Sequence, residues 1–200
     1  MRHARVYVVI APQMLWVHRR PCLTQNERST MTSVTDTNTP AKRNLPAMIG
    51  LTALPLAVGG LASLLTSTAM VQFKAFAQPP LSPPAWLFPV AWTGLYLLMG
   101  LGSYRLYRHA PANTTETKAR RMALAIYGIQ LAINFSWSLV FFGVGAHWMA
   151  FGLLMTMWAM IIALVVLSSK LDRIAAWLFV PYLVWTTFAA YLNVMIAILN

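Results

Sequence analysis

Residues that could carry acid–base or nucleophilic chemistry are few in this sequence. Its 200 residues include four acids, which are Glu27, Asp36, Glu116 and Asp172. All of them fall outside the long apolar runs, so no pair of carboxylates is placed there for general acid–base catalysis. The single Cys22 excludes an internal disulfide framework, and no group of Cys and His has the spacing of a zinc site. We therefore expect no catalytic residues, no metal site and no tightly bound cofactor.

Two carboxamides lie in an apolar segment, where they need partners. At about 100° per residue, Gln130, Asn134 and Trp137 share one face of a helix expected over 121–141. An unsatisfied polar side chain in hydrocarbon costs on the order of several kcal/mol, so this face should point into a helix bundle. There it would either hydrogen-bond to neighbouring helices or contact a ligand, and both interpretations stay open.

Aromatic stripes at helical spacing occur on two further segments. Trp92 and Tyr96 lie one turn apart, and Trp185, Ala189 and Leu192 form a second stripe. Such stripes are often plain packing, or an interfacial belt in which Trp and Tyr favour lipid headgroups. The alternative is that they wall one cavity, because the small Ala189 leaves space beside Trp185 and the carboxamide face could orient a ligand. We expect this cavity to be the binding site.

The face opposite the carboxamides carries a row of small residues. The row consists of Ala125, Gly128, Ala132 and Ser136. Small residues let helices approach closely, either within one bundle or between subunits. Because the carboxamide face should point into the bundle, the row of small residues should point outward. The sequence therefore predicts a homodimer through this row.

The elements that would position these residues are membrane-spanning helices. With 58% apolar and 10% charged residues, the composition lies outside the range of soluble globular proteins. Four runs without Asp, Glu, Lys or Arg are each long enough to span, and the longest must hold two helices separated by FGVGAH at 142–147. Nothing alternates as transmembrane β-strands would. We expect an all-α integral membrane protein, a five-transmembrane-helix bundle, with helices near 46–70, 85–105, 121–141, 147–168 and 174–198.

The net charge of +11 is explained by the membrane topology, because the basic residues cluster at helix ends and do not form one nucleic-acid-binding face. In a five-span arrangement, Lys74 is alone on one side. The opposite side carries Lys42, Arg43, Arg105, Arg108, Lys118, Arg120, Arg121, Lys170 and Arg173. Because positive residues favour the cytoplasmic side, the N-terminus is expected inside and the C-terminus outside. Lipid is thus an expected partner and nucleic acid is not.

Two segments outside the helices are distinctive. Residues 1–44 are basic and rich in Ser, Thr and Asn, which predicts a disordered tail before a membrane domain over 45–200. Met31 opens a polar stretch, so residues 1–30 are a possible upstream extension. The linker QPPLSPP at 78–84 cannot be helical, because prolines lack the amide donor and favour extended backbone before them. We expect it to form a stiff cap.

Four segments together resemble one known family. They are PPAWLFPVAWTGLYLLMGLGSY from Pro83, QLAINFSW from Gln130, FFG from Phe141 and VPYLVWTTFAAYLN from Val180. In this order they resemble the TspO/MBR family, the tryptophan-rich sensory proteins of bacteria and the mitochondrial translocator protein, over about residues 46–194.

The resemblance implies a five-helix bundle, commonly dimeric, with a pocket under the first loop for porphyrins and similar apolar ligands. The ligand positions that it implies are Trp92, Tyr96, Asn134, Trp137, Trp185, Ala189 and Leu192. It also makes a bacterial cell membrane the expected location. The expected function is a receptor or regulator that binds a tetrapyrrole, such as a porphyrin or haem precursor; a porphyrin transporter and a light-dependent porphyrin-degrading enzyme are the alternatives.

The chain departs from the family pattern near the first loop. Gln72-Phe73 stands where the family has Trp-Tyr, and Gln78-Pro79-Pro80-Leu81 stands where it has Lys-Pro-Ser-Trp. The C-terminal segment also lacks the Tyr and basic residue of the mammalian cholesterol motif. The loss of loop aromatics favours binding over degradation, and sterol recognition by that motif is not expected.

Overall fold

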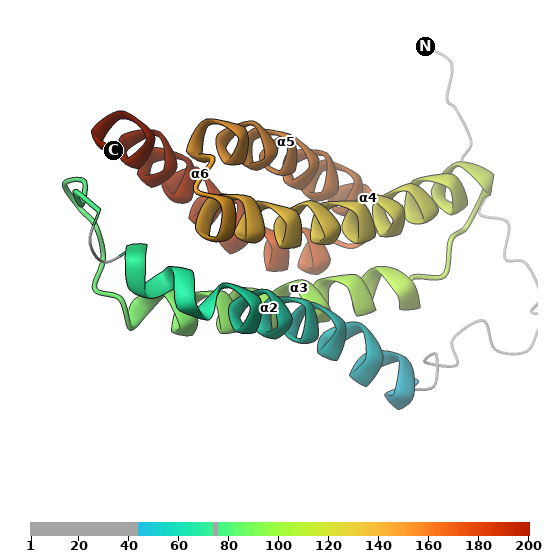
Figure 1. Ribbon diagram of the computed structural model, residues 1–200. Coiled ribbons are helices and arrows are strands. Elements are labelled where there is room, and N and C mark those ends of the chain that lie inside the picture. Colours follow the sequence, from blue (N-terminus) through green and yellow to red (C-terminus); the bar gives the residue numbers. More distant parts are fainter. Residues whose placement is uncertain (1–43, 74–75) are drawn as a thin grey trace, which may run out of the picture. The chain divides into compact units, whose positions relative to one another are not determined.

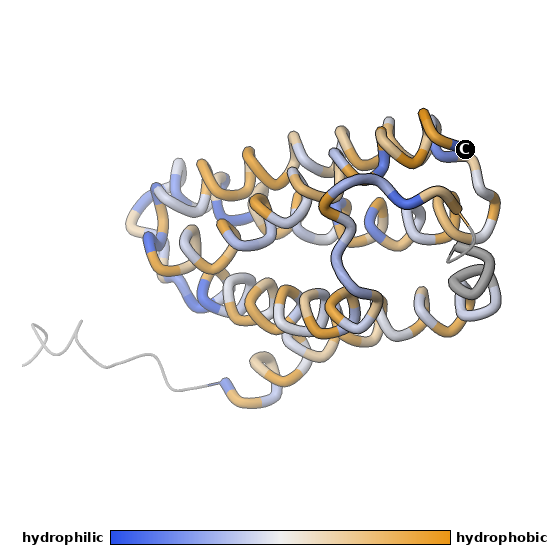
Figure 2. Tube along the Cα trace, turned by 90° about the vertical axis from the view of Figure 1, so that its left-hand side faces the viewer, coloured by the Kyte–Doolittle hydropathy of each residue, from blue (hydrophilic) through white to orange (hydrophobic). Residues whose placement is uncertain are grey.

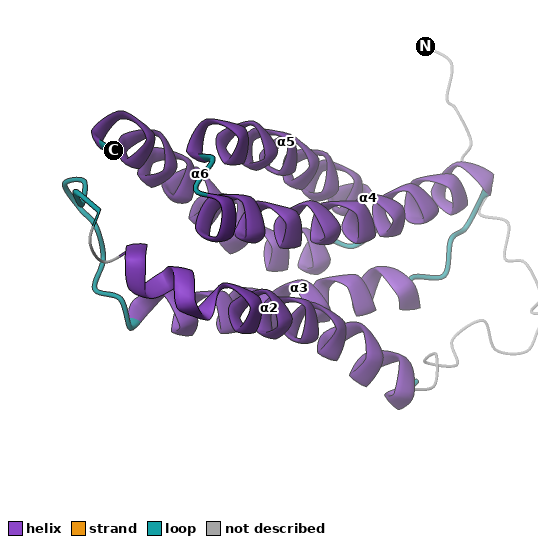
Figure 3. Cartoon of the chain, viewed as in Figure 1, coloured by secondary structure: helices purple, strands orange, loops and turns teal. Residues whose placement is uncertain are grey.

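The computed structural model describes residues 44–73 and 76–200, with side chains for 44–68 and 76–200. Across these ranges the chain consists of helices and short connections and contains no strand (Figure 3). The predicted tail lies outside the described residues except for Asn44, and so does Lys74. The all-α fold that the sequence predicts is confirmed.

Five long helices make up the described part of the chain, and each contains a segment long and apolar enough to cross a membrane. They agree with the expected spans to within a few residues, apart from the start of the third. Their bounds are α2 (Leu45–Phe73), α3 (Leu87–Arg108), α4 (Thr114–Ser138), α5 (His147–Leu171) and α6 (Arg173–Leu199). Prolines inside α2 and α6, Pro55 and Pro181, do not end either helix.

The third span begins seven residues earlier than the sequence analysis expected, at Thr114 instead of 121. The Asn113 side chain caps the helix by accepting a 2.8 Å hydrogen bond from the Glu116 amide, and the Glu116 carboxylate accepts from the Ala112 amide at 2.9 Å. The first bond satisfies an amide that the helix start leaves unpaired, and the second fixes the residue before the cap to the first turn. The connection between the second and third spans is therefore shorter than the expected bounds imply and covers residues 109–113.

The predicted break at 142–147 is where the chain reverses between the third and fourth spans. A π-helix, η1 (Leu139–Val144), follows α4 directly, and Gly145 then takes a left-handed conformation with φ of 70°. Glycine adopts this left-handed conformation readily because it has no Cβ. His147 starts α5, so only two residues connect the helices.

The helices pack as a closed circuit. α2 lies along α3, α3 along α6, α6 along α5 and α5 along α4, while α4 and η1 return to α2 (Figure 1). α2 and α3 approach each other closely at Gly100, where an added Cβ would lie 2.5 Å from the Thr52 Cα. Hydrophobic residues continue along the helices, while hydrophilic residues gather in loops and at helix ends (Figure 2).

One end of the bundle holds the described basic residues, because α3 and α5 end there and α4 and α6 begin there. At this end Arg105 Nε donates a 2.8 Å hydrogen bond to Asp172 Oδ2. Burial raises the pKa of Asp172, but the Arg105 bond and charge and the Ile174 and Ala175 amides outweigh it, so the net pKa is lowered from 3.8. Asp172 is the single residue between α5 and α6, and it caps α6.

Candidate functional site

A cavity of about 590 Å³ lies among the helices near the loop that joins α2 to α3. α2, α3, α4, η1 and α6 all contribute to its wall, and the loop contributes Gln78 and Ser82. Gly60 and Ser63 line the cavity and are exposed, so the cavity reaches the surface beside α2. Its volume falls within the range of about 300–1,000 Å³ typical of small-molecule sites.

Most of the predicted ligand positions lie on this cavity. The lining includes Trp92, Tyr96, Trp137, Trp185, Ala189 and Leu192. They come from α3, α4 and α6, so residues as much as 100 positions apart in sequence, Trp92 and Leu192, share one wall. The stripes derived from helical spacing therefore converge in the fold, as the cavity interpretation requires.

Trp92 is at the centre of the aromatic wall. Its ring stacks on Tyr96 with centroids 5.5 Å apart and planes at 30°, and it meets Trp137 at 6.2 Å and 38°. Trp185 lies edge-on to it at 6.4 Å and 82°. Offset and edge-on contacts at these separations are the favourable geometries for aromatic pairs. The wall is thus a packed cluster with several ring faces in different orientations.

Trp137 is held in position by contacts to three other elements. Its indole Nε1 donates to Asn193 Oδ1 at 3.3 Å. The side-chain Nδ2 of Asn193 in turn donates to the backbone carbonyl of His147 at 2.9 Å. Its ring stacks on Phe141 at 5.3 Å and 22°. These contacts join α4, η1, α6 and the start of α5, so the Trp137 ring has little freedom to move.

Asn134 is buried but does not line the cavity. Its Oδ1 accepts a 2.9 Å hydrogen bond from the Tyr96 hydroxyl, and its Nδ2 donates to the Tyr182 hydroxyl at 3.1 Å. The Tyr182 hydroxyl in turn donates to Gln130 Oε1 at 2.9 Å. The carboxamide face therefore hydrogen-bonds to neighbouring helices, the first of its two interpretations. A ligand contact by Asn134 stays a prediction.

The sequence analysis missed two parts of the wall. Phe141 and Phe142 both line the cavity, since the π-helix carries them next to Trp137. α2 contributes Leu56, Gly59, Gly60 and Ser63. These four residues follow the spacing i, i+3, i+4, i+7 of one helix face, a signal that could have been recognised. A Cβ on Gly59 would overlap the Tyr96 ring, so glycine is what lets this side of α2 meet α3.

The loop that joins α2 to α3, at the mouth of the cavity, is hydrogen-bonded to the C-terminal end of α6. The Tyr191 hydroxyl donates to the Pro80 carbonyl at 2.9 Å, and the Ala77 amide donates to Asn200 Oδ1 at 3.0 Å. Pro79 is buried, and Leu81 adopts a positive φ of 67°. These bonds and the restricted proline backbone are consistent with the stiff cap that the sequence predicts.

The described lining of the cavity contains no Asp, Glu, Lys, Arg or His. Its polar groups are hydroxyls and carboxamides, including Ser138 and Asn193. Within the described residues no group of three or more His, Cys, Asp or Glu could hold a metal ion. The cavity therefore presents aromatic and aliphatic surface with a few neutral hydrogen-bonding groups.

The predicted subunit face lies outside the bundle. Ala125, Gly128, Ala132 and Ser136 are all exposed, and an added Cβ on Gly128 would meet nothing within 4 Å. The row is thus not used for packing within the described part of this chain. The homodimer itself stays a prediction.

Comparison with known proteins gives consistent matches. The family model described as the TspO/MBR family matches residues 51–199. The tryptophan-rich sensory protein of Cereibacter sphaeroides is 40% identical over 116 residues, covering 58% of this chain and 68% of that protein. Protein CrtK of Rhodobacter capsulatus is 35% identical over 130 residues, covering 64% and 78%. The translocator protein of Bos taurus is 34% identical over 147 residues, covering 72% and 85%.

Proposed function

The chain belongs to the TspO/MBR family of multi-pass membrane proteins, and we propose that it is a receptor or regulator that binds a tetrapyrrole or a similar flat apolar molecule. The observation that carries this proposal is the indole wall: Trp92, Trp137 and Trp185, from three helices, border one cavity. Indole rings offer flat apolar faces on which a planar macrocycle can stack. Relatives named as sensory and translocator proteins support a role in recognition rather than turnover.

The charge distribution suggests how a porphyrin would be oriented. Ionised carboxylates are costly to bury without a partner, and the described lining contains no cation. The macrocycle would therefore lie against the indoles, while its propionates point to the mouth and the aqueous interface. Lys74, which the sequence places on that side of the membrane, is outside the described residues.

The assembly and topology that we propose follow the sequence expectations. A homodimer would form through the exposed small row of α4, and the basic end of the bundle would face the cytoplasm of a bacterial cell. In this orientation the capped mouth of the cavity faces the opposite side. The receptor would thus sample its ligand from the outer half of the membrane.

A porphyrin titration of the purified protein tests the proposal. Trp92→Leu combined with Trp185→Leu should weaken protoporphyrin binding at least tenfold, or about 1.4 kcal/mol, because two stacking faces are lost. Binding is read from the absorbance of the porphyrin, so that removing tryptophans does not change the probe. The matched control is Trp148→Leu, since Trp148 is exposed and does not line the cavity.

The same titration separates the alternatives. Equal affinity in the double variant and the wild type would overturn the indole-wall site. The degrading enzyme would be favoured if the porphyrin absorbance fell under light, a product appeared and the absorbance did not return in the dark. Porphyrin flux into proteoliposomes would favour the transporter, which needs two access states. A receptor binds reversibly in light and dark and gives no flux.

A further inference from the structure

A second concave surface lies on the outside of the bundle, between α3 and α6. This groove has a volume of about 700 Å³ and is lined only by apolar residues. Its floor includes Gly94 and Leu98 of α3, and its other side is formed by Trp177, Pro181, Val184 and Phe188 of α6. Trp185 borders both the groove and the cavity, so it forms part of the wall between them.

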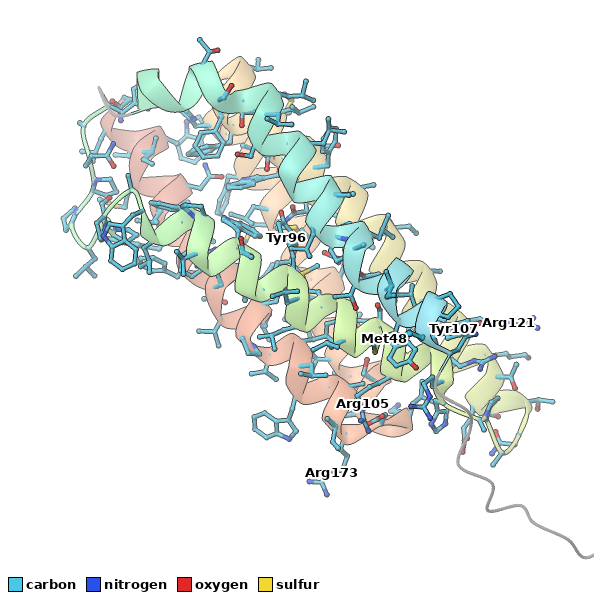
Figure 4. All side chains as sticks on the ribbon, turned by 90° about the horizontal axis from the view of Figure 1, so that it is seen from below. Met48, Tyr96, Arg105, Tyr107, Arg121 and Arg173 are labelled. Carbon is cyan, nitrogen blue, oxygen red and sulfur yellow. The ribbon has the colours of Figure 1, made fainter. Side chains whose placement is uncertain are left out.

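The two helices that line the groove each continue into an arginine at the same end. On α6, Trp177, Pro181, Val184 and Phe188 form one face, and Arg173 lies on this face four residues before Trp177. On α3, Arg105 lies seven residues beyond Leu98 and so faces the same way. Figure 4 shows Arg105 and Arg173 together at this end of the bundle.

The charge at this end is not balanced within the described part of the chain. Arg105 is paired with Asp172 through the 2.8 Å contact. Arg173 is exposed and makes no ion pair with any described residue. The one described carboxylate at this place is thus paired with Arg105, and the charge of Arg173 remains unbalanced at the end of an apolar groove.

The length of the groove matches one leaflet of a bilayer. From Trp177 to Phe188 the α6 axis rises about 16 Å, at about 1.5 Å per residue. Half of a hydrocarbon core about 30 Å thick is about 15 Å. Arg173, one turn beyond Trp177, would then lie at headgroup level, and Trp177 would lie at the interface that Trp favours.

We propose that the α3–α6 groove is a binding site for a phospholipid with an anionic headgroup. One acyl chain lies along the groove over Gly94, where no side chain fills the space, and the headgroup phosphate pairs with Arg173 beside Arg105. The charge is complementary because the lipid supplies the anion that Arg173 lacks. The occupant is therefore an anionic lipid of the leaflet at the basic end of the bundle, and its site is distinct from the internal cavity.

Native mass spectrometry of the full chain, delipidated and then titrated, tests this site. The probes are phosphatidylglycerol and phosphatidylcholine with identical acyl chains. We expect about fivefold tighter retention of phosphatidylglycerol, about 1 kcal/mol, the usual effect of one basic residue near a membrane surface. Arg173→Gln should remove this preference. The control Arg121→Gln, an exposed arginine at the same end but on α4, should keep it.

A second variant tests the groove without touching the charge. Gly94→Leu fills the groove, and because an added Cβ meets nothing within 4 Å it should not disturb folding. It should reduce retention of both lipids at least threefold while the preference between them remains. The proposal is overturned if neither lipid is preferred, if Arg121→Gln loses the preference as fully as Arg173→Gln, or if Gly94→Leu leaves lipid retention unchanged.

Discussion

The Tyr96 hydroxyl donates a 2.9 Å hydrogen bond to Asn134 Oδ1 and so ties α3 to α4 at the cavity wall. Tyr96 contributes its ring to the cavity and its hydroxyl to the buried bond, whereas Asn134 does not line the cavity. Through Tyr182 the same chain of hydrogen bonds reaches α6. The polar groups that a membrane interior cannot solvate are thus used to fix the position of the aromatic wall.

Removing this hydroxyl should destabilise the fold. Tyr96→Phe leaves Asn134 Oδ1 buried without its Tyr96 donor, and an unsatisfied buried acceptor costs about 1–3 kcal/mol. The measurement is thermal unfolding in detergent, compared with Tyr107→Phe, which alters an exposed tyrosine of the same helix. Equal unfolding temperatures for the two variants would show that the bond contributes nothing to stability.

The close approach of α2 to α3 should be sensitive to one methyl group. Gly59→Ala introduces a Cβ that overlaps the Tyr96 ring, and forcing extra volume into a packed site costs about 1–3 kcal/mol. We expect lower stability and weaker porphyrin binding, because Tyr96 must move. Gly60→Ala is the matched control, since its Cβ meets nothing within 4 Å although Gly60 also lines the cavity. Similar losses in both variants would contradict the steric argument.

The contribution of Asp172 to stability should depend on pH in a defined direction. The folded-state pKa of Asp172 is lowered from 3.8, so the ionised carboxylate stabilises the fold above that pH. This contribution is lost as the pH falls through the lower folded-state value. Asp172→Asn keeps an acceptor for the α6 amides but removes the charge that pairs with Arg105.

The free energy of unfolding of the wild type and of Asp172→Asn should therefore differ most near neutral pH. The difference should shrink as the pH is lowered below about 4. Denaturant unfolding of both proteins in the same detergent, from about pH 7 to about pH 3, measures it. A difference that grows on acidification would contradict the assigned pairing.

The subunit interface can be tested on the small row of α4. Ala132→Leu places a larger side chain where two helices would meet closely, so a dimer should become monomeric. The mass of the detergent-solubilised particle, measured by light scattering, gives the result. Val166→Leu, which adds volume on the exposed face of α5, is the control and should leave the mass unchanged. A dimeric mass in Ala132→Leu would remove this row from the interface.

Much of the fold could be predicted because its determinants are local. Runs of about 20 apolar residues are needed to cross a bilayer, so the five spans follow from the four charge-free runs and from the break at 142–147 in the longest of them. Helical periodicity likewise places Trp92 beside Tyr96, and Trp185 beside Ala189, on single faces. The early start of α4 could also have been predicted from Asn113 and Glu116, which have the spacing of a capping box.

The remaining features depend on contacts between helices. The sequence left Asn134 with two possible roles, and the fold pairs it with Tyr96 and Tyr182, residues 38 and 48 positions away. Phe141 and Phe142 line the cavity beside Trp137 through a π-helix that periodicity did not predict.

The sequence by itself determined which residues share a helix face, because that depends only on the regular turn of the backbone. The tertiary structure decided which faces meet, that α2 forms one wall of the cavity and that an apolar groove remains between α3 and α6. These features arise from the summed packing of many side chains on different helices, which no single segment specifies.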